Sequence, residues 1–274
     1  MECVHDHFKG YKGVDLFYRN WRSSKHQAAV IAIHGLGSHS GGFQNIANFI
    51  APKGFSLYAM DLRGHGLSAG QRAFINQWAE YLEDLRCFLE MVRESEGKRP
   101  LFLIGHSMGG LIALDYVMHE PSGIDGVVAI CPALNHRELQ KVVDNTPENT
   151  PNAASVQYKP NFKVLTSDPV ILADLEKDPL QHQMKTIGLA RGMLGAIKRV
   201  INDAYTLNVP LLMMHGLKDR IVPPEMARIF FEKVMFEDKK WIGYPEMLHN
   251  PQDDIQRDQV FADLYTWLKK HSEN

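Results

Sequence analysis

The fold of this chain is decided by one stretch, Gly105-His106-Ser107-Met108-Gly109-Gly110. An apolar run of strand length, 101–104, leads directly into it, and an apolar run with helical character, 111–117, follows it. A strand, the pattern Gly-x-Ser-x-Gly and a helix in succession predict a strained turn that exposes the serine hydroxyl beyond the strand. Gly105 and Gly109 would remove side chains that collide where strand and helix nearly touch. The stretch therefore predicts a nucleophilic Ser107, with the backbone N–H of Met108 facing the same space.

Apolar runs of strand length alternate with helical spacing along most of the chain. The expected strands are 8–11, 15–21, 28–33, 55–60, 101–104, 126–130, 209–214 and 239–242, and the expected helices are 43–51, 77–94, 224–234 and 259–270. The first two strands would form an antiparallel hairpin turned at Lys12-Gly13. The later strands are continuous apolar runs separated by helices, which is typical of a parallel sheet covered on both faces. The chain is therefore predicted to be an α/β protein with a mostly parallel, eight-stranded sheet.

One region, residues 135–207, breaks this alternation and contains no convincing strand. Its first part, 144–160, is rich in Asn, Pro, Thr and Ser and is predicted to be a loop. Its second part, 169–205, has the spacing of two or three amphipathic helices. We expect a helical cap inserted after the sixth strand, over the carboxyl edge of the sheet where ligands bind in such folds. The predicted organisation is a core of residues 1–134 and 208–274 and a cap of residues 135–207.

Bulk composition excludes several classes of function. The chain carries 30 Lys and Arg against 32 Asp and Glu, so we expect no nucleic-acid partner. Its first residues lack the basic and apolar segments of a secretory signal, and no apolar stretch reaches the ~20 residues that span a bilayer. The three cysteines are widely spaced, which predicts reduced thiols and a cytoplasmic protein. The histidines of His5-Asp6-His7 are assigned to a flexible terminus and not to a metal site.

A nucleophilic serine in this kind of turn needs an acid and then a histidine later in the chain. Three histidines follow the cap: His215, His249 and His271. His271 lies in a polar tail and is expected to face solvent, and His215 precedes the best acid. His249 lies in an irregular loop between the last strand and the last helix. The order and the elimination together predict His249 as the general base.

The preferred acid is Asp219, which comes just past the strand 209–214. A carboxylate there can hold the imidazole N–H and stabilise the imidazolium. Asp203 is the second choice because it precedes that strand, and Asp238 is assigned to the solvated surface. The loop His34-Gly35-Leu36-Gly37 follows the strand 28–33, where the second oxyanion donor is expected. We therefore predict the backbone N–H groups of Leu36 and Met108 as the oxyanion hole, with the His34 side chain holding the loop.

A second glycine motif competes with this interpretation. Residues 64–69, Gly-His-Gly-Leu-Ser-Ala, match the dinucleotide-binding pattern G-x-G-x-x-A after a strand. The nearest acids, Glu83 and Asp84, fall inside a predicted helix instead of ending a strand, and no helix opens on these glycines. We interpret residues 61–68 as a structural turn in which Asp61 and Arg63 hold the loop.

Five motifs stand in the order typical of one enzyme family: residues 34–37, 61–68, 105–110, 215–219 and 248–249. They resemble the monoacylglycerol lipase and lysophospholipase branch of the α/β-hydrolases, which is related to serine aminopeptidases. The resemblance covers nearly the whole chain except the cap and implies the α/β-hydrolase fold. It implies the following roles: nucleophile Ser107, acid Asp219, base His249, and oxyanion donors Leu36 and Met108.

These observations predict a serine hydrolase, without cofactor or metal, that cleaves carboxylic esters carrying one acyl chain through an acyl-enzyme. Its substrates would resemble monoacylglycerols or lysophospholipids. The apolar, methionine-containing cap is expected to take the acyl chain. It is also the part that would make a transient contact with a membrane surface. The sequence leaves the acyl-chain length and the oligomeric state open.

Two alternatives remain at this point. The first is a proline-iminopeptidase-like aminopeptidase, which would need a carboxylate in the cap to grip the substrate's ammonium. The candidates for that carboxylate are Asp168, Asp174, Glu176, Asp178 and Asp203. The second is a non-catalytic binding protein with the same fold. It ranks last because such proteins usually lack a member of the triad, whereas this chain has all three.

Overall fold

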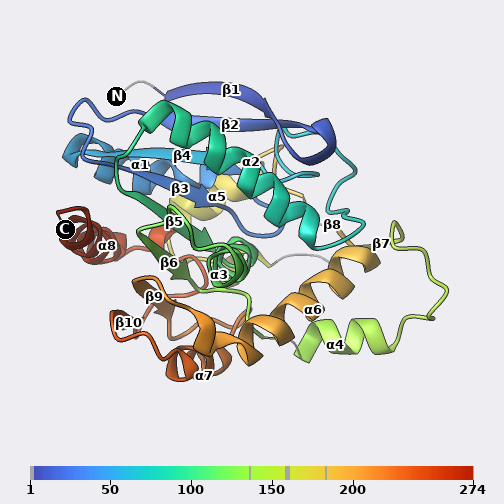
Figure 1. Ribbon diagram of the computed structural model, residues 1–274. Coiled ribbons are helices and arrows are strands. Elements are labelled where there is room, and N and C mark those ends of the chain that lie inside the picture. The colour runs from blue at the N-terminus through green and yellow to red at the C-terminus, as the bar shows by residue number, and fades with distance from the viewer. Residues whose placement is uncertain (1–2, 136, 158–160, 183, 274) are drawn as a thin grey trace.

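The computed structural model describes residues 3–135, 137–157, 161–182 and 184–273, and it is built around one large sheet (Figure 1). The strands of this sheet are β1 (Cys3–Lys9), β2 (Asp15–Trp21), β3 (Ala28–Ile33), β4 (Phe55–Met60), β5 (Leu101–His106), β6 (Gly126–Ile130), β9 (Leu211–Gly216) and β10 (Lys239–Tyr244). They lie in the order β1-β2-β4-β3-β5-β6-β9-β10. β1 pairs with β2 and β2 with β4 in antiparallel fashion, and every later pair is parallel. The predicted α/β fold with a mostly parallel, eight-stranded sheet is confirmed.

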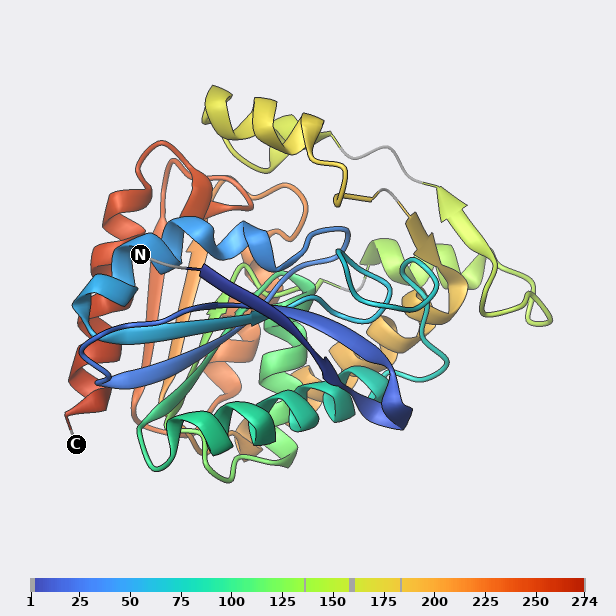
Figure 2. The same cartoon turned by 90° about the horizontal axis from the view of Figure 1, so that it is seen from above.

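The central strands are apolar because helices cover both of their faces. Every residue of β3, β4, β5, β6 and β9 is buried. The helices of the core are α1 (Gln44–Ile50), α2 (Ala79–Glu96), α3 (Met108–His119), α7 (Pro224–Lys233) and α8 (Arg257–Ser272). α1 and α8 pack on one face of the sheet, and α2, α3 and α7 pack on the other (Figures 1 and 2). The carboxyl ends of the parallel strands are thereby left as the edge at which a site can form.

The segment between β6 and β9 forms a separate layer beside this edge. It contains α4 (Arg137–Asp144), β7 (Ser155–Gln157), α5 (Pro169–Lys177), β8 (Met184–Thr186) and α6 (Ile187–Asn202). Figure 2 shows α5 and the two short strands at the periphery of the molecule, away from α2. α6 packs against α3, so the helix that follows the serine turn also supports this segment.

The expectation that residues 135–207 contain no strand was wrong. β7 and β8 pair in antiparallel fashion, with Ser155 opposite Thr186. Each strand has only three residues, which is too short for a recognisable alternation of apolar and polar side chains. Their pairing joins segments far apart in the sequence, so no local turn signal predicts it.

Two assignments near the ends of the chain also need correction. His5-Asp6-His7 does not belong to a flexible terminus but to the edge strand β1, whose register continues from Lys9 opposite Asp15 to Cys3 opposite Trp21. The strand was predicted at 8–11, too late in the chain, because most of the side chains before Phe8 are exposed. His271 does not face solvent either. It is buried, with Nδ1 bonded to the Trp267 carbonyl and Nε2 3.1 Å from Asp238 Oδ2.

Short turns of 3-10 helix connect these elements. They are η1 (Tyr11–Gly13), η2 (Ser40–Phe43), η3 (Ala51–Lys53), η4 (Phe162–Val164), η5 (Ala204–Thr206) and η6 (Pro251–Asp253). Within the described part of the chain, no helix is long and apolar enough to cross a lipid bilayer.

Candidate active site

Ser107 occupies the sharp turn between β5 and α3. Its φ of 53° and ψ of −118° are a conformation that residues other than glycine rarely adopt. The turn fits only because its neighbours lack side chains. A Cβ on Gly105 would lie 2.3 Å from the Gly109 carbonyl oxygen, and one on Gly109 would lie 2.0 Å from that of Ile33. The close approach of strand and helix predicted from the sequence is therefore present, and it fixes the direction of the serine side chain.

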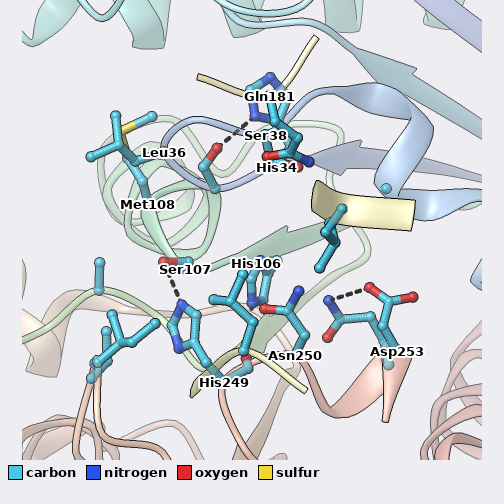
Figure 3. Close-up of a pocket in the computed structure, with 18 of the residues that line it drawn as sticks. His34, Leu36, Ser38, His106, Ser107, Met108, Gln181, His249, Asn250 and Asp253 are labelled. Carbon is cyan, nitrogen blue, oxygen red and sulfur yellow. Dashed lines mark hydrogen bonds between the residues drawn. The ribbon is translucent and has the colours of Figure 1, made fainter. Parts of the chain in front are cut away.

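The structure brings Ser107, His249 and Asp219 into one hydrogen-bonded chain. His249 Nε2 lies 3.0 Å from Ser107 Oγ, as drawn in Figure 3, and His249 Nδ1 lies 2.6 Å from Asp219 Oδ2. Because an ionised carboxylate can only accept, His249 donates from Nδ1 and accepts the serine hydroxyl proton at Nε2. This tautomer is the one a general base needs.

Asp219 is held in the charged form that this arrangement requires. Burial raises the pKa of its carboxyl group. The charge of His249, the hydrogen bonds from His215 and His249, and the N–H of Val222 outweigh burial and hold that pKa well below its usual value. Asp219 Oδ1 also accepts the N–H groups of Ile221 and Val222, at 2.8 and 2.9 Å. The acid is thus a fixed carboxylate at neutral pH.

Two histidines beside these residues were not assigned to the site by sequence reasoning. His106 donates from Nε2 to the carbonyl oxygen of His249 at 3.0 Å, and burial lowers its pKa to about 3, so its ring is neutral. His215 Nε2 lies 3.5 Å from Asp219 Oδ2 and bonds to the Val222 carbonyl. Two sequence signals could have indicated them: a His directly before Ser107 and a His four residues before Asp219. Both residues hold loops that carry the site.

Among the described residues, one group has the spacing of a metal site: Cys131, Asp219 and His249, whose candidate ligand atoms lie within 4.8 Å of one another. Burial raises the pKa of the Cys131 thiol well above its usual value, so the thiol stays protonated and is a poor ligand. Asp219 and His249 are bonded to each other. The donor set therefore fits a proton-transfer chain better than a metal ion.

Leu36 and Met108, the predicted oxyanion residues, both line the cavity above Ser107 (Figure 3). Met108 begins α3, so its N–H has no partner within the helix. Gly35 allows the neighbouring loop to approach, since a Cβ there would lie 3.0 Å from Ser107 Cβ. His34 holds that loop, as expected: its Nε2 accepts the Leu62 N–H at 3.0 Å.

The competing glycine motif forms a structural turn. Asp61 accepts the N–H groups of Ser40 and Leu67, at 2.6 and 2.7 Å, and Arg63 forms two hydrogen bonds to the buried Asp84. These bonds were expected for a loop held by Asp61 and Arg63. The carboxylate of Asp84 is used inside the fold and is not available to a ribose.

The serine hydroxyl opens into a cavity of about 430 Å³ between the core and residues 135–207. Its apolar lining comes from both sides. The inserted segment contributes Leu139, Leu165, Leu175 and Met193, and the rest of the chain contributes Leu36, Phe43, Met108, Ala133, Ile221 and Val222. In the described part of the chain, the cavity lining includes none of the five carboxylates that an ammonium-binding cap would use. Asp168 pairs with Arg257, and Asp178 pairs with His39, both at 2.6 Å. The carboxylate that does line the cavity, Asp253, lies in the core and was not predicted.

The inserted segment is bonded directly to the loop that carries His249. The Asn250 N–H donates to the Leu165 carbonyl at 2.7 Å, and Thr166 Oγ1 donates to the Asp253 carbonyl at 2.8 Å. A second attachment joins the segment to the loop that contains Leu36, where the His182 N–H donates to the Gly37 carbonyl at 3.0 Å. The two walls of the cavity are therefore connected on both sides of Ser107.

Known proteins share this architecture along almost the entire chain. A family described as "Serine aminopeptidase, S33" matches residues 24–256. A monoacylglycerol lipase of Mycolicibacterium smegmatis is 28% identical over 278 residues, which cover 96% of this chain and 96% of that protein.

Solved structures agree with this relationship. The crystal structure of Paleococcus ferrophilus monoacylglycerol lipase has 27% identity and a TM-score of 0.81, covering 99% of this chain and 100% of that one. A soluble variant of Saccharomyces cerevisiae monoglyceride lipase, in complex with a substrate analog, has 21% identity and a TM-score of 0.87, with 97% and 94% covered, and shows the same fold. The predicted resemblance to these α/β-hydrolases is confirmed. The chain belongs to the serine aminopeptidase S33 family.

Proposed function

We propose that the chain is a serine hydrolase that cleaves carboxylic esters of single-acyl lipids, with Ser107 as nucleophile, His249 as base and Asp219 as acid. The observation that carries the proposal is the continuous chain from Ser107 Oγ through the imidazole to the buried carboxylate, with distances of 3.0 and 2.6 Å. The chain's membership in a hydrolase family and its similarity to a protein named monoacylglycerol lipase support an ester as the substrate.

In the proposed reaction, His249 Nε2 takes the hydroxyl proton as Ser107 Oγ attacks the ester carbonyl. The carbonyl oxygen becomes an oxyanion that the N–H groups of Leu36 and Met108 stabilise. His249 then gives its proton to the leaving alkoxide, and the acyl group remains on Ser107. A water molecule, deprotonated by His249, releases the acid and restores the serine. Asp219 stays ionised throughout and stabilises the imidazolium.

We assign the choice of substrate to residues 135–207 as a cap, and the chemistry to residues 1–134 and 208–274 as a core. The cap contributes the side chains of Leu139, Leu175 and Met193 to the cavity. This apolar wall suits one acyl chain, and a flexible methionine can adapt to chains of different length.

The aminopeptidase alternative is less well supported. Its requirement is a cap carboxylate facing the serine, and the cap carboxylates named above do not line the cavity in the described part of the chain. The test nevertheless includes amide substrates, because one carboxylate outside the cap, that of Asp253, lines the cavity.

A fluorophosphonate probe tests the catalytic assignment. The wild type should be labelled, whereas Ser107→Ala should not, and its ester turnover should fall at least about 10⁴-fold because the nucleophile is absent. The control Ser24→Ala changes an exposed serine outside the cavity and should behave as wild type. Equal labelling of the wild type and Ser107→Ala would overturn the proposal.

A substrate panel then tests the class of substrate. Monoacylglycerols of several chain lengths should be cleaved with a higher kcat/KM than amino-acyl amides. If the amides are cleaved faster, the chain is an aminopeptidase and not a lipase, and the proposed roles of Ser107, His249 and Asp219 stay the same.

A further inference from the structure

Asp254, in the loop that follows His249, has a buried carboxylate that the proposed reaction does not use. It lies between β10 and α8 and is 2% exposed. Burying a carboxylate costs free energy unless hydrogen-bond donors surround it. The donors that Asp254 has found come from two parts of the chain that are far apart in the sequence.

One oxygen of Asp254 binds the inserted segment, and the other binds the loop of the base. Oδ1 accepts the N–H of Ser167 at 3.2 Å and also the Ser167 hydroxyl, besides the N–H of the adjacent Ile255 at 2.8 Å. Oδ2 accepts the N–H of Leu248 at 3.1 Å. Because Leu248 immediately precedes His249, one side chain joins the inserted segment to the backbone beside the proposed base.

Three hydrogen bonds hold the backbone around His249, and they differ in where their partners come from. The first comes from the core, where His106 Nε2 donates to the His249 carbonyl oxygen at 3.0 Å. The second comes from the inserted segment, where the Leu165 carbonyl accepts the N–H of Asn250 at 2.7 Å. The third is the bond to Oδ2 of Asp254. Since the second and the third both involve the inserted segment, the position of the imidazole depends on where that segment lies.

The stretch that contains Ser167 also borders the substrate cavity. Leu165 lines the cavity, and so does Leu175 of α5, the helix that begins at Pro169. Ser167 lies between these two positions in the chain. An acyl chain that packs against Leu165 and Leu175 would therefore favour the docked position of Ser167, because a ligand shifts a protein toward the conformation that it contacts best.

We propose that Asp254 is a positioning residue that couples the inserted segment to the general base. Its carboxylate keeps His249 in line with Ser107 while Ser167 is bonded to its other oxygen, and the base loses this position when the segment moves away. The inference rests on the proposed function, because it takes His249 to be the base. In the described part of the chain Asp254 is not among the residues that line the cavity, so it acts through the backbone of Leu248 and not on the substrate.

Two substitutions break the two sides of this link separately. Ser167→Ala removes the hydroxyl donor at an exposed position and leaves Asp254 bonded to Leu248. Asp254→Asn keeps the size of the side chain but leaves one acceptor oxygen. That oxygen should face the three donors now bonded to Oδ1, which turns the NH2 group toward the Leu248 N–H and leaves that N–H without an acceptor.

The measurement is kcat and KM for a short-chain aryl ester, expressed per active site titrated with a fluorophosphonate, so that unfolded protein is not counted. Asp254→Asn should lower kcat about 100-fold with KM nearly unchanged, because a displacement of the base by about 1 Å costs that factor. Ser167→Ala should lower kcat about 5-fold, as a modest coupling between two sites does. Ser167→Thr retains the hydroxyl and should restore kcat. A merely structural role would lower Tm and the number of titrated sites and leave kcat per site unchanged.

The double variant decides whether the two residues act through one path. If they do, Ser167→Ala should cause no further loss of kcat in the Asp254→Asn background. The controls Ser155→Ala, at an exposed serine of β7, and Asp258→Asn, at an exposed aspartate of α8, should behave as wild type. An unchanged kcat per site in either single variant, or losses that multiply in the double variant, would overturn the coupling. A wild type that is not labelled, or that is labelled no more than Ser107→Ala, would instead refute the proposed function.

Discussion

The two sides of the cavity differ in how crowded their backbones are. On the core side, several positions admit only glycine: a Cβ on Gly109 would lie 2.0 Å from one carbonyl oxygen, and a Cβ on Gly216 would lie 2.0 Å from another. In the inserted segment, a Cβ on Gly188 would lie 2.8 Å from the Ile75 carbonyl oxygen, but Gly195, on the exposed side of the same helix, has nothing within 4 Å. The difference teaches that the turn around Ser107 tolerates fewer side chains than the outer side of α6.

A pair of glycine substitutions gives the largest expected contrast. Gly109→Ala should lower the free energy of unfolding by about 3 kcal/mol or more, because the methyl group must displace the backbone of Ile33. Its ester turnover should fall at least about 100-fold, because a displacement of the serine turn by about 1 Å is enough to slow the reaction by that factor. Chemical denaturation and kcat/KM measure both effects.

Gly195→Ala is the matched substitution in the cap. It should raise the free energy of unfolding by about 0.5–1 kcal/mol, because alanine suits a helix interior and meets no atom within 4 Å. If both substitutions lowered the free energy of unfolding by similar amounts, the two positions would be equally crowded, which would contradict the comparison.

The folded protein is expected to be less stable at higher pH because of one buried carboxyl group on the core side of the cavity, that of Asp253. Burial is the main cause that raises the pKa of Asp253 to about 6 from its usual 3.8. The folded protein therefore holds this proton where the unfolded chain has lost it, so the contribution to stability is complete below pH 3.8 and is lost as pH rises through 6. The loss is on the order of 3 kcal/mol.

Asp253→Asn removes this titration. The Tm of the variant minus that of the wild type should therefore become more positive from pH 4 to pH 8, whatever the cost of the altered hydrogen bonds. Asp258→Asn, at an exposed site on α8, serves as control and should show little change across that range. A difference that stays constant with pH would mean that Asp253 titrates normally.

The smallest expected effect concerns the cap. Leu175 lines the cavity and is only half-buried, so Leu175→Ala should leave Tm within a few degrees of the wild type. It should change the preference between short and long acyl chains by a few-fold, in line with about 0.8 kcal/mol per methylene group. The ratio of kcat/KM for octanoyl and palmitoyl esters measures it. Val170→Ala, on the exposed side of the same helix, should leave that ratio unchanged.

The core could be predicted from the sequence because its signals are local. The apolar strands and the glycines around Ser107 follow from residues next to each other in the chain. His249 and Asp219 followed from the order of motifs, and the structure places both within hydrogen-bonding distance of their predicted partners.

The inserted segment and the contacts around His249 could not be predicted in the same way. β7 and β8 pair over a long separation without a pattern. His106 donates to the carbonyl oxygen of His249, which lies 143 positions away in the chain, and no local pattern indicates that contact.

The bonds between the cap and the loop of His249 have a consequence for protein engineering. The Leu165 carbonyl accepts the Asn250 N–H, and Asp168 pairs with Arg257. A chimera that exchanged the whole of residues 135–207 for the matching segment of a relative would remove these partners of Asn250, which follows His249, and of Arg257. A graft that retains residues 165–168 with the recipient core keeps them. The boundary for such an exchange should therefore lie within residues 135–207 and not at the ends of β6 and β9.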